Sequence, residues 1–134
     1  MIERVKSRMK PFRKVIIAGS RSFKDYALLS KIMQELYFIP DIEVVCGEAN
    51  GADLLGRMWA EECGIGIHSF PADWKTYGKY AGIERNQRMG EFADEAVVFW
   101  NGNSKGTQNM INIMKLLGKP VTVVTFGEQK GDER

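Results

Sequence analysis

The chain has 134 residues, of which 44% are hydrophobic and 27% are charged, and its formal net charge is +2. This length suits one domain, because two separate cores would each be too small to be stable, and the composition is that of an ordinary globular protein. No apolar run approaches the roughly 18–20 residues that a helix needs to cross a bilayer, so no membrane-spanning helix is expected.

The chain begins with a basic arm, which we place at residues 1–13. Residues 1–14 carry six basic side chains and one acid, so the remainder has 13 basic and 16 acidic residues and is slightly acidic. Any affinity for nucleic acid would therefore come from the arm, and a short basic arm is more often a solvated terminus. No signal-peptide pattern is present, so we expect a cytoplasmic protein. Its two cysteines, Cys46 and Cys63, match no metal or redox spacing and are expected to be reduced thiols.

Strands and helices alternate through residues 14–125, and a polar tail follows at 126–134. Short apolar runs that end at glycine or proline predict strands over residues 15–18, 43–46, 65–70, 96–100 and 121–125. Apolar residues at helical spacing predict helices over residues 26–37, 51–63, 80–93 and 107–117. Leu54, Leu55, Met58 and Trp59 are expected to form the packed face of the second helix. Continuously apolar strands joined by helices predict an α/β fold, a parallel five-stranded sheet covered by helices on both faces.

Right-handed crossovers place every strand-to-helix turn along one edge of such a sheet, where ligands bind. The first of these turns contains Gly19, Ser20 and Arg21. A glycine lets the backbone approach a ligand closely, the serine offers a hydroxyl, and the arginine offers a bidentate phosphate fork. The same pattern also fits a tight connection without a ligand.

The second turn runs from Gly47 through Glu48 and Asn50 to Gly51 and Asp53. Asn50 at the helix N-cap and Asp53 in its first turn fit a purely structural role. Alternatively, the two glycines open room for a ligand and Glu48 or Asp53 accepts hydrogen bonds from sugar hydroxyls. The two interpretations are compatible.

The third turn, Ser104, Lys105, Gly106 and Thr107, joins the clearest strand to a helix. Free backbone N–H groups at the positive end of a helix bind anions, and the serine, threonine and lysine side chains add donors. The turn lacks the full spacing of the nucleoside-triphosphate loop, so we infer no ATP hydrolysis. A capped helix with a flexible loop is the structural alternative.

Two further groups of residues lie between these turns. Arg85 and Arg88 share a helical face that pattern alone assigns to the solvated surface. Three aromatic residues, Trp74, Tyr77 and Tyr80, fit pocket walls or core positions, or else stacking surfaces for a single-stranded nucleic acid. His68 is the only histidine, so neither a metal site nor histidine-based catalysis is expected.

Taken in order, the motifs resemble a known family. The segments I-I-A-G-S-R-S-F, C-G-E-A-N-G-A-D, F-P-A-D-W, R-N-Q-R-M and V-V-F-W-N-G-N-S-K-G-T resemble the small YspA-type (cpYpsA-related) members of the SLOG superfamily. The wider superfamily is similar to the Lonely Guy phosphoribohydrolases, the molybdenum-cofactor carrier proteins and the Rossmann domain of DNA-processing protein A. The resemblance covers about residues 14–125. It implies a single Rossmann-like domain that binds a nucleotide or nucleotide-derived molecule, and a homo-oligomer.

The resemblance also implies which residues contact the ligand. The matching positions are Gly19, Ser20, Arg21, Gly47, Gly51, Asp53, Arg85, Asn86, Ser104, Gly106 and Thr107. With Glu48 and Lys105, which the turns themselves suggest, these form the predicted binding site, without a cofactor or metal. Arg85 thereby changes from a surface residue to an expected ligand contact.

One position departs from the Lonely Guy pattern, in which G-T-x-x-E supplies a catalytic glutamate. Here that position is Met110, which can neither transfer a proton nor stabilise an oxocarbenium ion. We therefore expect a non-catalytic protein that senses or sequesters a nucleotide, for instance a defence signal. The alternative is a nucleoside 5′-monophosphate phosphoribohydrolase that recruits Glu48 or Glu84, or else Asp53 or Asp73. A second alternative is a single-stranded nucleic-acid binder.

Overall fold

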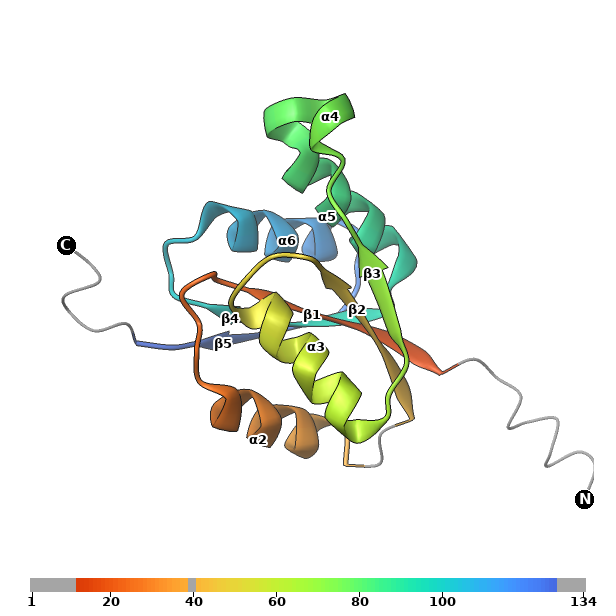
Figure 1. Ribbon diagram of the computed structural model, residues 1–134, viewed down its shortest axis with the longest axis vertical. Coiled ribbons are helices and arrows are strands. Elements are labelled where there is room, and N and C mark those ends of the chain that lie inside the picture. Colours follow the sequence, from red (N-terminus) through yellow and green to blue (C-terminus); the bar gives the residue numbers. More distant parts are fainter. Residues whose placement is uncertain (1–11, 39–40, 128–134) are drawn as a thin grey trace, which may run out of the picture.

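The computed structural model describes residues 12–38 and 41–127 (Figure 1). Its strands are β1 (Arg13–Gly19), β2 (Ile42–Gly47), β3 (Ile67–Phe70), β4 (Glu95–Trp100) and β5 (Val121–Thr125). Its helices are α2 (Tyr26–Leu36), α3 (Ala52–Cys63), α4 (Trp74–Tyr77), α5 (Ala81–Phe92) and α6 (Lys105–Leu116), with the short 3-10 helix η1 (Gly78–Tyr80) between α4 and α5. Most of the predicted basic arm and polar tail lies outside the described residues.

The five strands form one parallel sheet in the order β3-β2-β1-β4-β5. The chain first moves outward from β1 to β3 and then returns to add β4 on the other side of β1. This reversal places a topological switch point between the carboxyl ends of β1 and β4, where ligands bind in open α/β sheets. The predicted fold class is confirmed.

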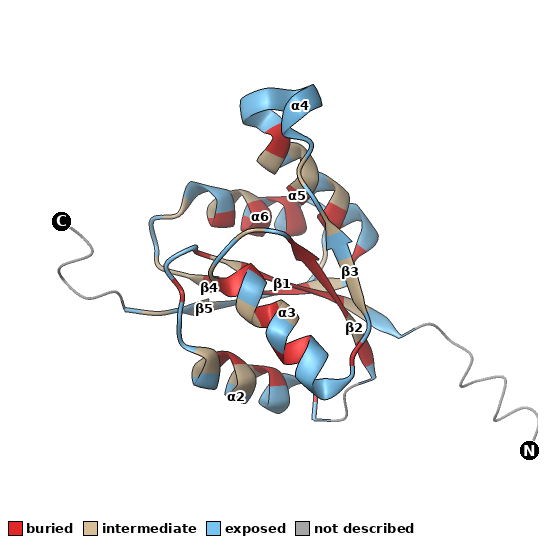
Figure 2. Cartoon of the chain, viewed as in Figure 1, coloured by how far each residue is buried: buried red, intermediate tan, exposed pale blue. Residues whose placement is uncertain are grey.

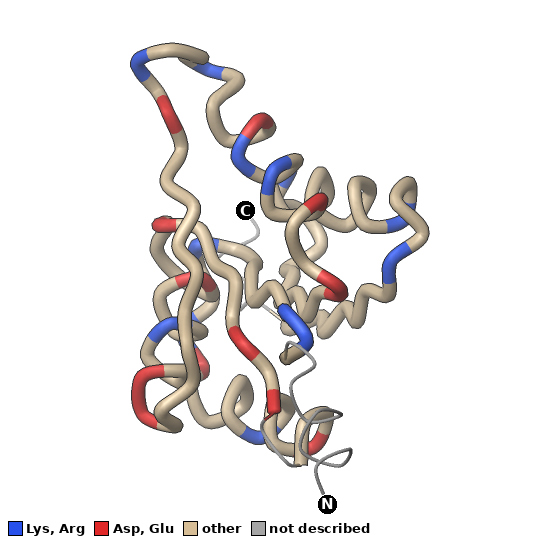
Figure 3. The backbone as a smooth tube through the Cα atoms, turned by 90° about the vertical axis from the view of Figure 1, so that its right-hand side faces the viewer, with Lys and Arg blue, Asp and Glu red and all other residues tan. Residues whose placement is uncertain are grey.

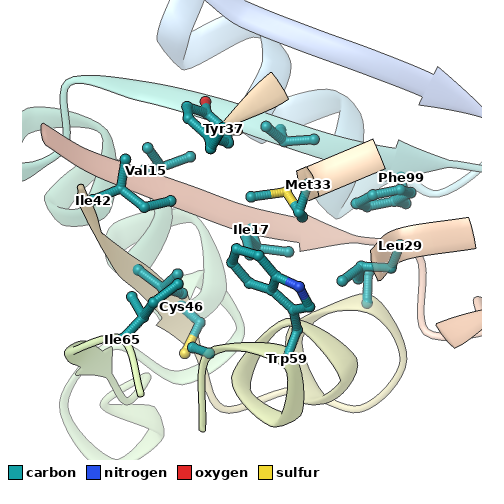
Figure 4. Close-up of a cluster of buried hydrophobic side chains, with 14 of the residues drawn as sticks. Val15, Ile17, Leu29, Met33, Tyr37, Ile42, Cys46, Trp59, Ile65 and Phe99 are labelled. Carbon is teal, nitrogen blue, oxygen red and sulfur yellow. The ribbon is translucent and has the colours of Figure 1, made fainter. Parts of the chain in front are cut away.

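Two hydrophobic clusters fill the two faces of the sheet. On one face α2 and α3 cover Val15, Ile17 and Phe99, and Figure 4 shows these side chains in one cluster with Trp59 of α3. On the other face α5 and α6 cover the alternate residues of β1, Ile16 and Ala18. Side chains alternate across a strand, so a continuously apolar strand such as β1 is buried from both sides (Figure 2).

Helix α3 presents a different face to the core from the one that apolar spacing predicted. Leu54 and Met58 are exposed, whereas Trp59 is buried as expected. The buried stripe instead contains Asp53 and Gly56. A Cβ at Gly56 would lie 2.5 Å from Ile17 Cγ2, so the glycine lets the helix approach β1 along its small-residue side. The two larger apolar side chains are thereby turned toward solvent.

The start of α3 also differs from the prediction. Gly51, with φ of 75°, occupies the N-cap position and Asn50 provides no side-chain cap. A Cβ at Gly51 would lie 2.4 Å from the carbonyl oxygen of Ser20. Close contact between the turns after β1 and β2 thus requires glycine here, and it takes precedence over capping by asparagine.

Helix α4, η1 and the start of α5 project from the body of the domain (Figure 1). Residues 73–80 are all exposed. In the described part of the chain, no helix is long and apolar enough to cross a membrane. The two cysteines are free, Cys46 buried in β2 and Cys63 exposed at the end of α3.

Candidate functional site

A cleft of about 510 Å³ opens at the switch point between β1 and β4. Its walls come from the turn after β1, the starts of α3 and α6, and the cleft-facing side of α5. Nine of the residues predicted from sequence line it: Gly19, Ser20, Arg21, Asp53, Arg85, Asn86, Ser104, Gly106 and Thr107. The fold therefore brings the predicted turns together around one space.

The close approach of β1 and β4 forms the base of the cleft. The N–H of Ser20 donates to the carbonyl of Phe99 at 2.9 Å, and the N–H of Asn101 donates to Ser20 Oγ at 3.1 Å. A Cβ at Gly19 would lie 2.1 Å from Phe99 O. Ser20 is 1% exposed. Its hydroxyl, which the sequence predicted as a ligand donor, accepts the hydrogen bond that joins the two strand ends.

The α6 N-terminus forms one wall. Ser104 Oγ accepts from the N–H of Thr107 at 3.3 Å, and the two hydroxyl oxygens are 2.9 Å apart. Asn101 Oδ1 accepts from the N–H groups of Asn103 and Ser104 at 2.8 and 2.9 Å, which holds the loop before the helix. The predicted cap is present, and the capped helix start faces the cleft, where unpaired N–H groups and the helix dipole favour an anion.

Beneath this wall, Asp53 is a buried carboxylate, 5% exposed. It accepts hydrogen bonds from the N–H groups of Ala49 and Gly19, and the positive charges that act on it are those of Arg85 and Arg21. Burial raises the pKa of Asp53 to about 6, although Arg85, the two N–H donors and Arg21 all act to lower it. The cleft thus contains a carboxyl group that titrates close to neutrality.

Arg85 reaches the cleft across β2. Its Nη1 donates to the carbonyl of Phe70 at 3.4 Å, and its Nε donates to Asn86 Oδ1 at 3.2 Å. A Cβ at Gly47 would lie 2.5 Å from Arg85 Nη1 and 2.8 Å from Asp53 Oδ2. The missing side chain at Gly47 therefore leaves room for both the arginine and the carboxylate.

Asn86 positions its neighbours. Its Nδ2 donates to the carbonyl of Gly106 at 3.2 Å and to Asn109 Oδ1 at 3.0 Å, while its Oδ1 accepts from Arg85. These bonds occupy both ends of the amide and connect α5 to the first turn of α6. Asn86 thereby fixes the arginine relative to the α6 N-terminus.

Four predicted binding residues lie outside this cleft. Gly47 and Glu48 line a separate hollow of about 310 Å³, with Arg57 and Ser69 among its walls. Gly51 acts through the backbone contact described above, and Lys105 is exposed outside the lining.

The other proposed acids also lie away from the cleft. Glu84 pairs with Arg88, its Oε2 2.9 Å from Arg88 Nε, and Asp73 caps α4 by accepting from the N–H of Thr76 at 3.0 Å. Asp53 is therefore the one carboxylate among the described lining residues. Within residues 12–38 and 41–127, no three His, Cys, Asp or Glu side chains gather closely enough to hold a metal ion.

Trp74 lines the cleft, as one of its sequence interpretations, a pocket wall, expects, whereas Tyr77 and Tyr80 do not. Other lining residues carry no site prediction from sequence, chiefly Lys79, Gly82, Ile83, Met89 and Asn101. Positions 82, 85, 86 and 89 on α5 have the spacing of one helical face, so a ligand contact at Arg85 implies that its neighbours on this face line the site. Met110, 1% exposed, lies in the lining at the position where the Lonely Guy pattern has its glutamate.

The buried Asp53 predicts a pH-dependent stability. Its pKa is about 6 in the folded state and 3.8 in the reference state, so folding favours the protonated form. The stability of the fold is therefore at its full value, as far as Asp53 is concerned, below pH 4, and this contribution is lost as the pH rises through 6. Between pH 5 and pH 8 the free energy of unfolding of the wild type should fall by about 1–1.5 kcal/mol relative to that of Asp53→Asn. Urea unfolding of both proteins at both pH values measures this difference. A constant difference between the two proteins would contradict the raised pKa.

Comparisons with known proteins agree with the motif resemblance. Residues 13–77 match the family described as the YspA, cpYpsA-related SLOG family. The Gene 61 protein of Mycobacterium phage D29 is 34% identical over 125 residues, which covers 87% of this chain and 98% of that protein.

Two solved structures share the fold. DNA processing protein A (DprA) from Streptococcus pneumoniae has a TM-score of 0.74 and 17% identity, over 90% of this chain and 53% of that chain. The structural-genomics target TM1055 has a TM-score of 0.60 and 23% identity, over 81% and 72% of the two chains. The chain thus spans about half the length of the DprA chain, and at these identities the likeness concerns the fold alone.

Proposed function

Because the chain belongs to the YspA, cpYpsA-related SLOG family, we propose that it binds a nucleotide-derived small molecule in the cleft between β1 and β4 and does not cleave it. Charge at the cleft is the observation that carries this proposal. Arg21 and Arg85 line it with the positive end of α6, and Lys79 lines its mouth, against the single carboxylate of Asp53 among the described lining residues. Fixed donors around a space of this size suit a ligand that carries a phosphate group.

Met110 and the placement of the acids support binding without cleavage. Breaking an N-glycosidic bond needs a carboxyl group that transfers a proton or supports the oxocarbenium-like transition state. The methionine supplies neither, and Glu48, Glu84 and Asp73 do not line the cleft. A protein that binds and returns its ligand intact acts as a sensor of that ligand or as a store that sequesters it.

Asp53 favours one second candidate function. A carboxyl group with a pKa of about 6 is partly protonated near neutral pH, as a general acid requires. If the chain is a phosphoribohydrolase, Asp53 is the residue that the structure offers for proton transfer. The rate of base release would then fall as the pH rises above 6.

Two measurements on the purified protein distinguish the two functions. Purified protein is denatured to release bound material, and separately the native protein is incubated with nucleoside 5′-monophosphates. We expect an intact phosphate-bearing ligand in the first case and no free base in the second, as measured by mass spectrometry. Steady release of free base would contradict the proposal, and loss of that release in Asp53→Asn would establish the hydrolase instead.

A further inference from the structure

Trp74 lies at the mouth of the cleft as an exposed aromatic side chain. It is the first residue of α4 and 57% exposed, and Ile83, at 50%, lines the same part of the cleft. Tyr77 and Tyr80 have comparable exposure at 44% and 61%, yet neither lines the cleft. Of the three aromatic residues in this projecting segment, Trp74 alone faces the candidate site.

The projecting segment connects Trp74 with the start of α5. A Cβ at Gly82 would lie 3.9 Å from Trp74 Cη2, so the indole is close to the first turn of α5 without a side chain between them. Figure 3 shows several basic residues along the chain from α4 into α5. Lys79, between these two helices, lines the cleft. The mouth therefore combines a flat aromatic ring, an aliphatic side chain and one hydrogen-bond donor.

Polar groups occupy the other end of the cleft. Asn86, which holds the carbonyl of Gly106 at the α6 N-terminus, is four residues beyond Gly82, or about 6 Å along the axis of α5. Arg85 precedes Asn86 on α5 and bonds to it, and its charge acts on Asp53. Along α5 the cleft thus passes from an aromatic and aliphatic end to a charged one. A nucleotide has the same order, with base and phosphate on opposite sides of one sugar.

We propose that Trp74 and Ile83 form a nucleobase subsite, so that the cleft takes a nucleoside phosphate in preference to a sugar phosphate without a base. The inference rests on the proposed function and adds the position and class of the ligand. Lys79 lies beside the base and can donate to a ring nitrogen or a carbonyl oxygen. The phosphate lies at the α6 N-terminus with Arg85 and Arg21.

The test compares two classes of ligand on matched variants. Isothermal titration measures the affinity for ribose 5-phosphate and for the four common nucleoside 5′-monophosphates and diphosphates. Base stacking on an aromatic ring predicts that Trp74→Ala weakens the best nucleotide about tenfold or more, leaves ribose 5-phosphate unchanged, and that Trp74→Phe retains most of the affinity. Tyr77→Ala, which removes an exposed aromatic side chain of the same helix outside the cleft, should change neither.

The outcomes separate this inference from the proposed function. Ribose 5-phosphate that binds as tightly as every nucleotide, or a Trp74→Ala variant with unchanged nucleotide affinity, overturns the base subsite and leaves the phosphate-binding cleft in place. An equal loss for both ligand classes assigns Trp74 a structural role and also overturns the subsite. If no phosphate compound binds, both proposals are wrong.

Discussion

Gly19→Ala should lower the free energy of unfolding by about 3 kcal/mol or more, because overpacking against rigid backbone is costly. The new Cβ would lie 2.1 Å from Phe99 O and 2.9 Å from Ala52 Cβ, and neither is the end of a flexible side chain. Relief requires β1 and β4 to separate at their carboxyl ends. That movement would break the 2.9 Å hydrogen bond between Ser20 N–H and the carbonyl of Phe99. Urea unfolding followed by circular dichroism measures the loss.

Gly106→Ala is the matched control. This glycine lies in the first turn of α6 beside the same cleft, and nothing lies within 4 Å of the position of its Cβ. Alanine is the better helix former, so stability should be equal to that of the wild type or higher by up to about 1 kcal/mol. Equal unfolding midpoints for Gly19→Ala and the wild type would contradict the close approach of β1 and β4.

The sheet could be predicted from sequence because its signals are local. The predicted strand at 96–100 is observed as β4 (Glu95–Trp100), and 121–125 is observed as β5. Continuous burial from both sides produces uninterrupted apolar runs, and glycine or proline marks their ends. The crossover rule then placed the turns on one edge, and the cleft lies there.

The chemistry of individual acids could not be predicted in the same way. Glu48, Asp53 and Glu84 all carry a carboxylate, but of these three only Asp53 lines the cleft, where it is buried. Elements distant in sequence surround it: burial raises its pKa, whereas Arg85 from α5 and the N–H of Gly19 from β1 lower it. Tertiary contacts between separate elements decide which carboxylate has a raised pKa, and residue spacing along one segment carries no such information.

The same limitation applies to glycines. Sequence predicts that Gly47 opens space for a ligand, and the structure shows a packing role that sequence did not indicate, room for Arg85 and Asp53. Gly56 carried no signal at all, yet it determines which face of α3 packs on Ile17. A glycine that serves close packing between elements is indistinguishable in sequence from one that serves a turn.

Arg85→Ala should weaken the binding of a phosphate-bearing ligand by at least about 100-fold, the equivalent of two charge-assisted hydrogen bonds. The substitution removes the cation that Asn86 and the carbonyl of Phe70 hold at the cleft. It also leaves Asp53 without its strongest charge partner, so the pKa of that carboxyl should rise further and stability should fall above pH 6. Affinity is therefore measured by isothermal titration at pH 6, after thermal denaturation has shown that the variant is folded.

Two companion variants identify the cause of the loss. Arg85→Lys keeps the charge without the planar fork that bonds to Asn86, and its affinity should fall by about tenfold. Lys105→Ala removes a cation that the sequence predicted in the phosphate site but that does not line the cleft. The affinity of this variant for the ligand should therefore change less than about threefold. If Lys105→Ala loses as much affinity as Arg85→Ala, the binding reflects general attraction to positive charge, and the specific role of Arg85 in this cleft is wrong.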